Sequence, residues 1–161
     1  MIEISPFSSA FQDDVIDVIL PIQREEFGFP STIESQPDLL DIPNFYQSGA
    51  GGFWIALEGT KVVGTIALRD IGNHHGALRK MFVRATHRGK GYSVAERLLG
   101  HLVNASRGKL SDIFLGTTER YLAAHRFYEK NGFNRIADSA LPMAFPRVAA
   151  STRFYRLAVL E

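Results

Sequence analysis

The sequence contains no cysteine, and this absence removes several classes of chemistry. Disulfide bonds, thiolate metal sites and cysteine nucleophiles are all excluded. No apolar run approaches the roughly 20 residues that span a bilayer. The first residues, Met1 to Pro6, are too few and too polar to open a signal peptide. We therefore expect a cytoplasmic protein that does not associate with a membrane.

The chain also lacks an excess of charge of either sign. Its 18 basic and 17 acidic side chains leave a formal net charge of +1, so neither nucleic acid nor a membrane surface is expected as a partner. Any bound anion would have to be held by a local site. The 161 residues, 45% of them hydrophobic, fit one domain spanning 1–161 with a sizeable core.

The first third of the chain predicts a strand followed by two helices. Met1 to Ser5 has the pattern of a strand. Ser9 and Gln12 have the spacing of a capping box, and apolar residues at helical spacing follow them. Pro21 should kink or divide this helix. A second, short helix is expected from Pro37 to Gln47.

The rest of the chain alternates strands and helices. A hairpin is expected around the turn Glu58 to Lys61, a long helix after Val94 and another from Tyr121 to Asn131. This order predicts an α/β (α+β) fold with a mixed, largely antiparallel twisted sheet of about seven strands, flanked by about four helices. The further strands expected are Phe53–Leu57, Val62–Leu68, Leu78–Val83, Ile113–Leu115, Phe133–Ile136 and Thr152–Leu160.

A glycine-containing turn between a strand and a helix is the most informative segment. Gly89 and Gly91 allow close approach of an anion to the backbone, and the helix start presents unpaired N–H groups. Arg88 and Lys90 add positive charge, and Ser93 adds a hydroxyl. Taken alone, these residues fit an ordinary turn with a solvated basic edge as well as they fit an anion-binding turn. The P-loop and dinucleotide fingerprints do not fit.

Two blocks of sequence carry a resemblance to a known family. The pattern Arg88-x-x-Gly91-x-Ser93 resembles the acyl-CoA pyrophosphate motif of the GNAT (Gcn5-related N-acetyltransferase) superfamily. The preceding strand, Leu78 to Val83, resembles the central strand of that family. The segment from Ala124 to Phe133 is similar to its later helix and following strand. The blocks occur in the order of the family, and the resemblance covers nearly the whole chain.

The resemblance implies acetyl-CoA as co-substrate and no metal. In the family, the central strand splays from its neighbour and pairs with pantetheine, a role that would fall here on the backbones of Met81, Phe82 and Val83. An N–H in this stretch would also face the thioester carbonyl, where negative charge develops. Arg88 would lie beside the pyrophosphate. The backbone N–H groups implied to hold it belong to Gly89, Lys90, Gly91, Tyr92 and Ser93.

Tyr128 occupies the position of the general acid of the family, which hydrogen-bonds the departing sulfur. A phenol of pKa ~10 is a weaker acid than a thiol of pKa ~8.5, so complete proton transfer would be uphill by about 2 kcal/mol. We therefore expect hydrogen-bond stabilisation of the thiolate. The structural alternative is a packed aromatic, but Phe127 is expected to fill that core position. His125 and Lys130 fit phosphate contacts and a solvated helix face equally well.

Three residues depart from the pattern of the family. Ser93 stands at the final position of the phosphate motif, where the family has a smaller residue. Serine is also small, so the substitution is tolerable. Tyr121 stands where many members have an asparagine that orients the cofactor, and Ala77 stands where many carry a glutamate general base. The base is therefore unassigned. Its candidates are Glu25, Glu26, Glu34, His74, His75 and Glu119.

Neither histidine of the His74-His75 pair indicates a metal site. Adjacent side chains of a strand point to opposite faces and cannot share an ion. Both residues are interpreted as loop residues that flank a hairpin.

The acceptor pocket is expected between Phe27 to Ile42 and Leu141 to Tyr155. An ordinary hydrophobic core explains the aromatic residues there equally well; they are Phe29, Phe45, Phe145, Phe154 and Tyr155. The near-neutral charge argues against a strongly basic acceptor.

The sequence predicts an N-acyltransferase that moves an acetyl group from acetyl-CoA to a primary amine of a small molecule or peptide. The alternative is a non-catalytic domain that binds acyl-CoA, which Ala77 and Tyr121 keep open. Homodimers are common for this fold, so a homodimer is a further expectation by analogy.

Overall fold

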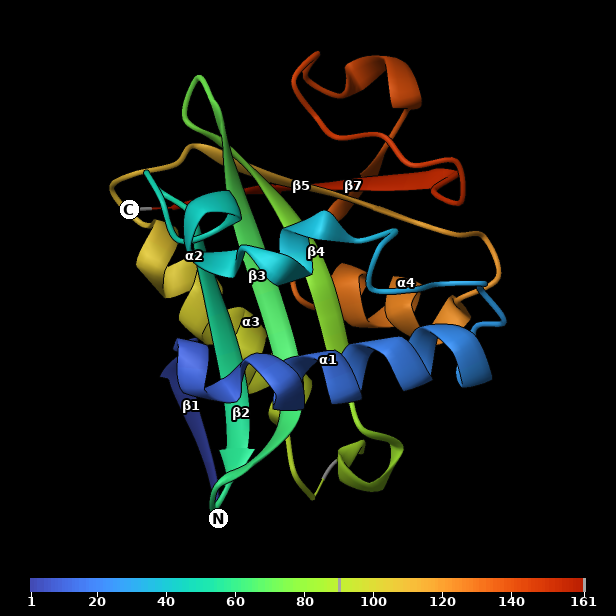
Figure 1. Cartoon of the computed structure of the whole chain (residues 1–161). Helices are drawn as coiled ribbons and strands as arrows, with labels where there is room; N and C mark the ends of the chain where they lie inside the picture. Colours follow the sequence, from blue (N-terminus) through green and yellow to red (C-terminus); the bar gives the residue numbers. More distant parts are fainter. Residues whose placement is uncertain (90, 161) are drawn as a thin grey trace.

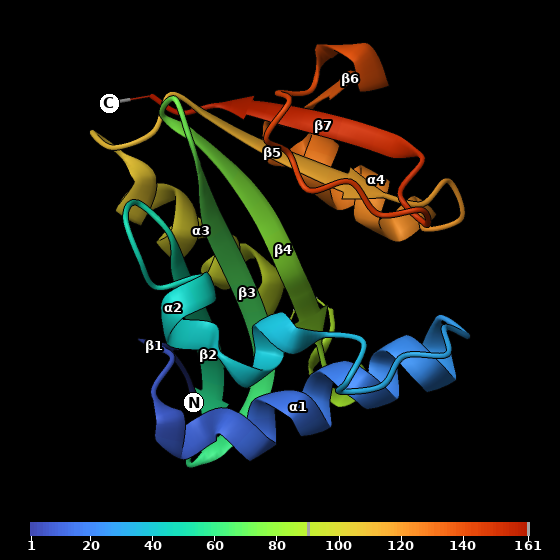
Figure 2. The same ribbon diagram turned by 45° about the horizontal axis from the view of Figure 1, so that its top comes forward.

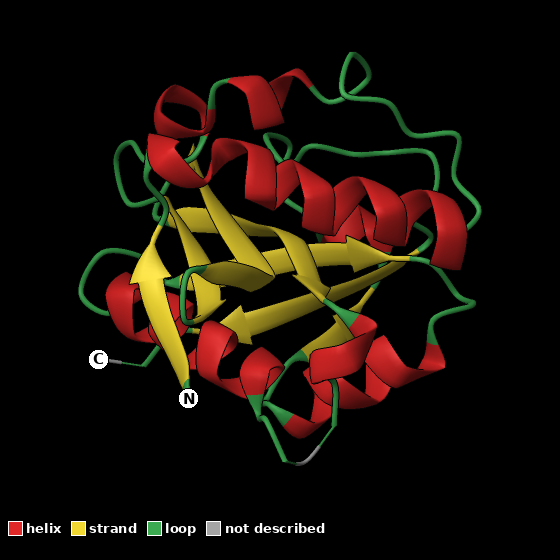
Figure 3. Cartoon of the chain, turned by 60° about the horizontal axis from the view of Figure 1, so that its bottom comes forward, coloured by secondary structure: helices red, strands yellow, loops and turns green. Residues whose placement is uncertain are grey.

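A twisted sheet forms the centre of the computed structural model, which describes residues 1–89 and 91–160. Within these residues the sheet has seven strands in the order β1-β2-β3-β4-β5-β7-β6, and only the β4–β5 pair is parallel (Figure 1). Helices cover both faces of the sheet (Figure 3). The predicted mixed, largely antiparallel sheet flanked by helices is confirmed.

The elements follow the predicted order, but the helix predicted from Pro37 to Gln47 is divided at Asp41 into a 3-10 turn and a four-residue α-helix. The strands are β1 (Ile2–Pro6), β2 (Gly52–Glu58), β3 (Lys61–Gly72), β4 (His75–Val83), β5 (Asp112–Thr117), β6 (Asn134–Ile136) and β7 (Arg153–Ala158). The α-helices are α1 (Gln12–Pro21), α2 (Ile42–Phe45), α3 (Val94–Ser106) and α4 (Leu122–Lys130). Shorter helical turns are η1 (Ser9–Phe11), η2 (Ile22–Glu26), η3 (Pro37–Leu40), η4 (Ala85–His87) and η5 (Asp138–Ala140).

The first helix differs at both ends from the prediction. No side chain caps its start, so the predicted capping box of Ser9 and Gln12 is wrong: a 3-10 turn precedes α1, and the Gln12 amide donates instead to the Leu39 carbonyl. At the other end α1 stops at Pro21, whose missing N–H breaks the α-helical pattern. The chain continues there as the π-helical turn η2. The predicted division at Pro21 is confirmed.

Each face of β2 and β3 is buried against a different helical layer. Val18 and Ile19 of α1 pack on one face together with Phe53 and Ile55 of β2. On the other face the α3 side chains, Leu102 among them, pack against alternate residues of the same strands. The sequences of both strands are therefore nearly continuous apolar runs, as expected for strands that are covered on two sides.

The strand β4 carries a β-bulge at Lys80. The register of β3 and β4 slips between the pairs Thr65–Phe82 and Ala67–Arg79, and Lys80 adopts a positive φ of 55°. The hydroxyl of Thr65 donates a hydrogen bond of 2.7 Å to the Lys80 carbonyl, and Thr65 is fully buried. The bulge is thus satisfied from the neighbouring strand, and it re-aims the side chains that follow it.

Among the described residues, no helix combines the length and the apolar character needed to cross a membrane.

The Thr65 hydroxyl predicts a specific loss of stability. Thr65→Val preserves the shape of the side chain but leaves the buried Lys80 carbonyl without this donor, so the free energy of unfolding should fall by about 1 to 3 kcal/mol. Urea denaturation followed by circular dichroism measures the change. Thr65→Ser keeps the hydroxyl and should recover part of the loss. Equal stability of the valine variant and the wild type would contradict this role.

Candidate active site

The sheet opens between β4 and β5. These strands pair only where His75 to Ala77 faces Asp112 to Phe114, and they diverge beyond this point (Figure 2). From Leu78 to Val83, β4 has no strand partner on the β5 side. Backbone N–H and C=O groups on such an edge need a partner. An extended ligand can supply it.

A large cavity of about 740 Å³ lies beside this open edge. It lies between β4, the start of α3 and the helix α4. The residues that line it are Ile22, Phe27, Met81, Phe82, Val83, His87, Arg88, Gly89, Val94, Ala95, Glu96, Arg120, Tyr121, Leu122, Ala123, Ala124, Phe127 and Tyr128. Met81, Phe82 and Val83, which the sequence singled out, all belong to this lining.

A small cavity of about 240 Å³ lies on the side of the loop that follows α1. Its walls are Gln23, Phe27, Phe29, residues Leu78 to Phe82 of β4, Leu115 to Thr118, and parts of α4 and of the loop before β7. Residues common to both linings place the two cavities next to each other; they are Phe27, Met81, Phe82, Tyr121, Ala124 and Tyr128.

The turn before α3 borders the large cavity. Gly89 has a φ of 105°, which L side chains rarely adopt, and a Cβ built on Gly91 would meet no atom within 4 Å. The N–H groups of Tyr92 and Ser93 make long hydrogen bonds of 3.3 and 3.4 Å to the Gly89 carbonyl. The helix itself begins at Val94, where its positive dipole end favours an anion. Lys90 lies outside the described residues.

Arg88 is held by two contacts at the edge of the large cavity. Its Nε donates to the Val83 carbonyl at 2.8 Å. Its two terminal nitrogens donate to the Glu26 carboxylate at 2.6 and 3.0 Å. This ion pair joins the turn before α3 to η2. Because both side chains are partly exposed, such a pair contributes little to stability. An incoming phosphate would compete with Glu26 for the same guanidinium.

Tyr128 is buried where the two cavities meet. Its ring packs near Phe127, Phe133 and Tyr155, with centroids 5.4 to 6.2 Å apart. Only 7% of Tyr128 is exposed, whereas Phe127 is half-buried, so the expectation that Phe127 fills the core position is wrong. Both residues line the large cavity, and Tyr128 also packs near Tyr155 of β7.

Burial also sets the acidity of Tyr128. Removal of the phenol from water raises its pKa well above the usual value near 10. No hydrogen bond joins its hydroxyl to another residue in the described part of the chain. The phenol is therefore neutral at all working pH values and can donate its proton in a hydrogen bond.

Phe27 and Tyr121 form a stack between η2 and the start of α4. Their ring centroids lie 4.3 Å apart at an interplanar angle of 31°. Both residues line both cavities, and the ring centroid of Phe27 also lies 6.3 Å from that of Phe82 in β4. Tyr121, which stands where many members of the family have an asparagine, thus has a packing role here. No local sequence pattern indicated this role.

Ala77 lies outside both linings. It is fully buried among Phe114, Leu141, Phe145 and Phe154. A carboxylate at this position would be surrounded by apolar side chains. The structure therefore offers no place for a base at position 77 without rearrangement of this cluster.

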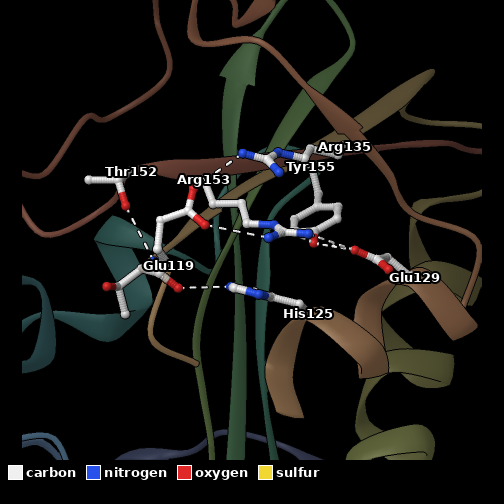
Figure 4. A network of polar contacts seen from close by, with 8 residues as sticks. Glu119, His125, Glu129, Arg135, Thr152, Arg153 and Tyr155 are labelled. Atoms are coloured by element: carbon white, nitrogen blue, oxygen red, sulfur yellow. Dashed lines mark hydrogen bonds and ion pairs between the residues drawn. The ribbon is translucent and has the colours of Figure 1, made fainter. Parts of the chain in front are cut away.

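None of the six candidate bases lines either cavity. Glu26 is paired with Arg88, and Glu119 is paired with Arg135 and Arg153 (Figure 4). His74 lies in the turn between β3 and β4, as predicted. The others are exposed Glu25 and Glu34, and His75, which begins β4 with its Nε2 3.8 Å from Asp112.

The prediction that both histidines are loop residues is thus wrong for His75. No group of three or more potential metal ligands occurs among the described residues.

A polar network that the sequence did not reveal joins α4 to β7. Arg153 contacts Glu129 of α4 at 3.1 Å, and the Tyr155 hydroxyl donates to the same carboxylate at 2.5 Å (Figure 4). This hydrogen bond lowers the pKa of Glu129. His125 is buried and contacts the Thr118 carbonyl at 2.8 Å, so both interpretations of His125 as a phosphate contact or a solvated residue are wrong.

A cavity lies where the acceptor pocket is expected, and its use by an acceptor stays a prediction. Segments from both expected ranges line the small cavity, with Phe27 and Phe29 from the first and Val148, Ala150 and Ser151 from the second. Of the five aromatics named from the sequence, only Phe29 belongs to the lining. Phe145 and Phe154 are core residues of the apolar cluster around Ala77.

Comparison with known proteins gives matches over most of the chain. The sequence model of the acetyltransferase (GNAT) family matches residues 16–133. A crystal structure of an acetyltransferase of the GNAT family from Staphylococcus aureus Mu50 has a TM-score of 0.93 at 32% identity, covering 99% of this chain and 100% of that one. An acetyltransferase from Streptococcus agalactiae 2603 has a TM-score of 0.91 at 31% identity and 98% coverage of both chains.

Curated relatives match over a shorter stretch. The N-acetylaspartate synthetase of Xenopus tropicalis is 40% identical over 105 residues, which cover 62% of this chain. The match spans 37% of the length of that relative.

The conformation of Gly89 predicts an asymmetry between the two glycines of the turn. Gly89→Ala places an L residue at a φ of 105°, so the free energy of unfolding should fall by about 1 to 3 kcal/mol. Gly91 lies outside the left-handed region and has open space around it. Gly91→Ala is therefore the matched control and should change stability by less than about 0.5 kcal/mol. Urea denaturation of both variants measures the free energy of unfolding, and equal losses in the two variants would contradict the predicted asymmetry.

Proposed function

The chain belongs to the acetyltransferase (GNAT) family, and we propose that it transfers an acetyl group from acetyl-CoA to a primary amine of a small molecule or peptide. The observation that carries this proposal is the open edge of β4, flanked by two cavities that meet at Tyr128. A large cavity for one substrate and a small one for the other suit a reaction in a ternary complex.

We assign the large cavity to coenzyme A, which its volume of about 740 Å³ and the lining residues Arg88 and Gly89 support. Acetyl-CoA supplies the reactive thioester when bound. The stretch from Met81 to Val83, which has no strand partner on the β5 side, would pair with its pantetheine arm. The pyrophosphate would lie at the turn before α3, at Arg88 and the backbone of the turn; the described residues assigned there are Gly89, Gly91, Tyr92 and Ser93.

Tyr128 would donate a hydrogen bond to the sulfur as the thiolate leaves. Its raised pKa makes it a poorer acid than an exposed phenol, so complete proton transfer is even less favourable than the reference values indicate. A neutral buried donor still stabilises developing negative charge, because little water competes with it. Stabilisation without proton transfer is therefore the role that we assign to it.

The acceptor amine would enter from the small cavity. No carboxylate lines this cavity among the described residues, so the structure supplies no adjacent general base. The amine then has to reach the thioester in its neutral form and lose its proton to water or to a more distant group.

Acetyl-CoA binding tests the cofactor assignment. Isothermal titration calorimetry should detect binding to the wild type, and Arg88→Ala should weaken it about 10-fold, the effect of losing a charge-assisted hydrogen bond. Glu26→Gln releases Arg88 from its ion pair. It should tighten binding roughly two- to five-fold, the range of an exposed pair.

Glu25→Gln is the matched control for Glu26→Gln, because it removes the same charge from the neighbouring exposed residue. Affinity should change less than twofold in this variant. Equal effects of the two substitutions would show that net charge matters and the ion pair does not. A wild type that does not bind acetyl-CoA would overturn the acyltransferase proposal.

Turnover tests the role of Tyr128. Tyr128→Phe keeps the packing of the ring and removes the donor, so kcat for acetyl transfer should fall roughly 10- to 100-fold when chemistry is rate-limiting. The affinity for acetyl-CoA should stay within twofold of the wild type. An unchanged kcat would remove Tyr128 from the mechanism. Binding of acetyl-CoA without turnover on any amine would instead favour a non-catalytic domain.

A further inference from the structure

Two basic residues line the small cavity without any acidic residue beside them in the lining. Arg79 and Lys80 follow each other at the β-bulge of β4, and the remaining lining residues that the structure describes carry no carboxylate. The chain as a whole has a net charge of only +1. The positive charge at this cavity is therefore a local feature that the composition conceals.

Lys80 has partners within the protein. Its Nζ donates to the Gln36 side-chain oxygen at 2.6 Å and lies 3.5 Å from the Asp38 carboxylate. Asp38 in turn accepts a hydrogen bond of 2.5 Å from the Tyr46 hydroxyl. Burial lowers the pKa of Lys80, and the Asp38 carboxylate opposes this shift. Lys80 and Asp38 thus form a buried pair that largely balances its own charge.

Arg79 has no such partner. No described carboxylate forms an ion pair with it, and its guanidinium carbon lies 5.8 Å from the centroid of the Phe45 ring. Arg69 lies closer to the same ring, with its guanidinium carbon 3.8 Å from the centroid. Arg69 does not line either cavity. Arg79 is therefore the unpaired cation of the small cavity, half-buried beside a second arginine.

A half-buried cation next to other cations is costly unless an anion joins it. The planar guanidinium has the geometry to bind a carboxylate through two parallel hydrogen bonds. We propose that the acceptor is a small amino acid or related amino carboxylate, and that Arg79 binds its carboxylate. This inference rests on the proposed acetyltransferase function and names the class of substrate for the same site.

The size and charge of the cavity support this class. Its volume of about 240 Å³ is below the roughly 300 to 1,000 Å³ of pockets for drug-sized ligands, which suits a molecule of amino-acid size. The unpaired Arg79 also disfavours polyamines and lysine-rich peptides, which carry further positive charge.

Matched acceptors test the inference. The panel contains L-aspartate, L-glutamate, L-leucine and L-phenylalanine, each beside its α-carboxamide, together with spermidine and a lysine peptide. We expect a kcat/KM at least 10-fold higher for one or more of the amino acids than for its amide. Arg79→Gln should raise the KM of that amino acid roughly 10- to 100-fold and leave the KM of the amide unchanged, which removes the preference.

Two further variants separate binding of the carboxylate from general effects. Arg69→Gln removes the neighbouring arginine that lies outside the cavity and should leave the preference intact. Arg79→Lys should retain part of it. The affinity for acetyl-CoA, measured by calorimetry, should be the same in all three variants and the wild type, which also verifies that each is folded.

The outcomes distinguish this inference from the proposed function. If the enzyme binds acetyl-CoA but acetylates no amino acid, or acetylates amides and polyamines equally well, the inference is wrong and the acetyl-CoA assignment stands. An unchanged preference in Arg79→Gln also overturns it. If acetyl-CoA does not bind at all, the proposed function and the inference fail together.

Discussion

The divergence of β4 and β5 is the constraint on which the rest of the site depends. Each strand keeps a complete partner on its outer side, β4 through β3 and β5 through all six residues that pair with β7. The two halves of the sheet are therefore stable without pairing to each other beyond Ala77. The backbone groups that this leaves unpaired lie between α3 and α4, at the wall of the large cavity (Figure 2). Unsatisfied backbone of this kind is costly unless a ligand or water pairs with it.

Two buried features hold this opening in place. The bulge at Lys80 interrupts the pairing of β4 with β3, and Thr65 satisfies it from within the sheet. On the other side, Tyr128 packs on Phe133 and Tyr155 and so fixes α4 against β5 and β7. The same packing dehydrates the phenol and raises its pKa. One contact thus supports the fold and favours a hydrogen-bonding role over proton donation in the proposed reaction.

Charge is distributed unevenly although the total is nearly zero. At the mouth of the large cavity Arg88 is paired with Glu26, so a phosphate that binds there exchanges one anionic partner for another. At the small cavity Lys80 is paired with Asp38, whereas Arg79 is not paired with any described carboxylate. The network around Arg153 holds a third set of charges at the surface of α4 and β7 (Figure 4). The first two arrangements suit an anionic cofactor and an anionic acceptor.

The sequence by itself determined the strands, the long helices and the turn at Gly89, because these depend on periodicity and backbone freedom within a few residues. Only the tertiary structure decided which side chains meet: that Tyr128 rather than Phe127 is buried, that Tyr121 stacks on Phe27, and that Gln12 bonds to Leu39 instead of capping its own helix. These contacts join residues from different elements or distant parts of the chain, and no local pattern encodes the distance between them. The same holds for charge, since composition reports the balance of all side chains but only folding decides that Arg79 lines a cavity that has no acidic residue among its described lining residues.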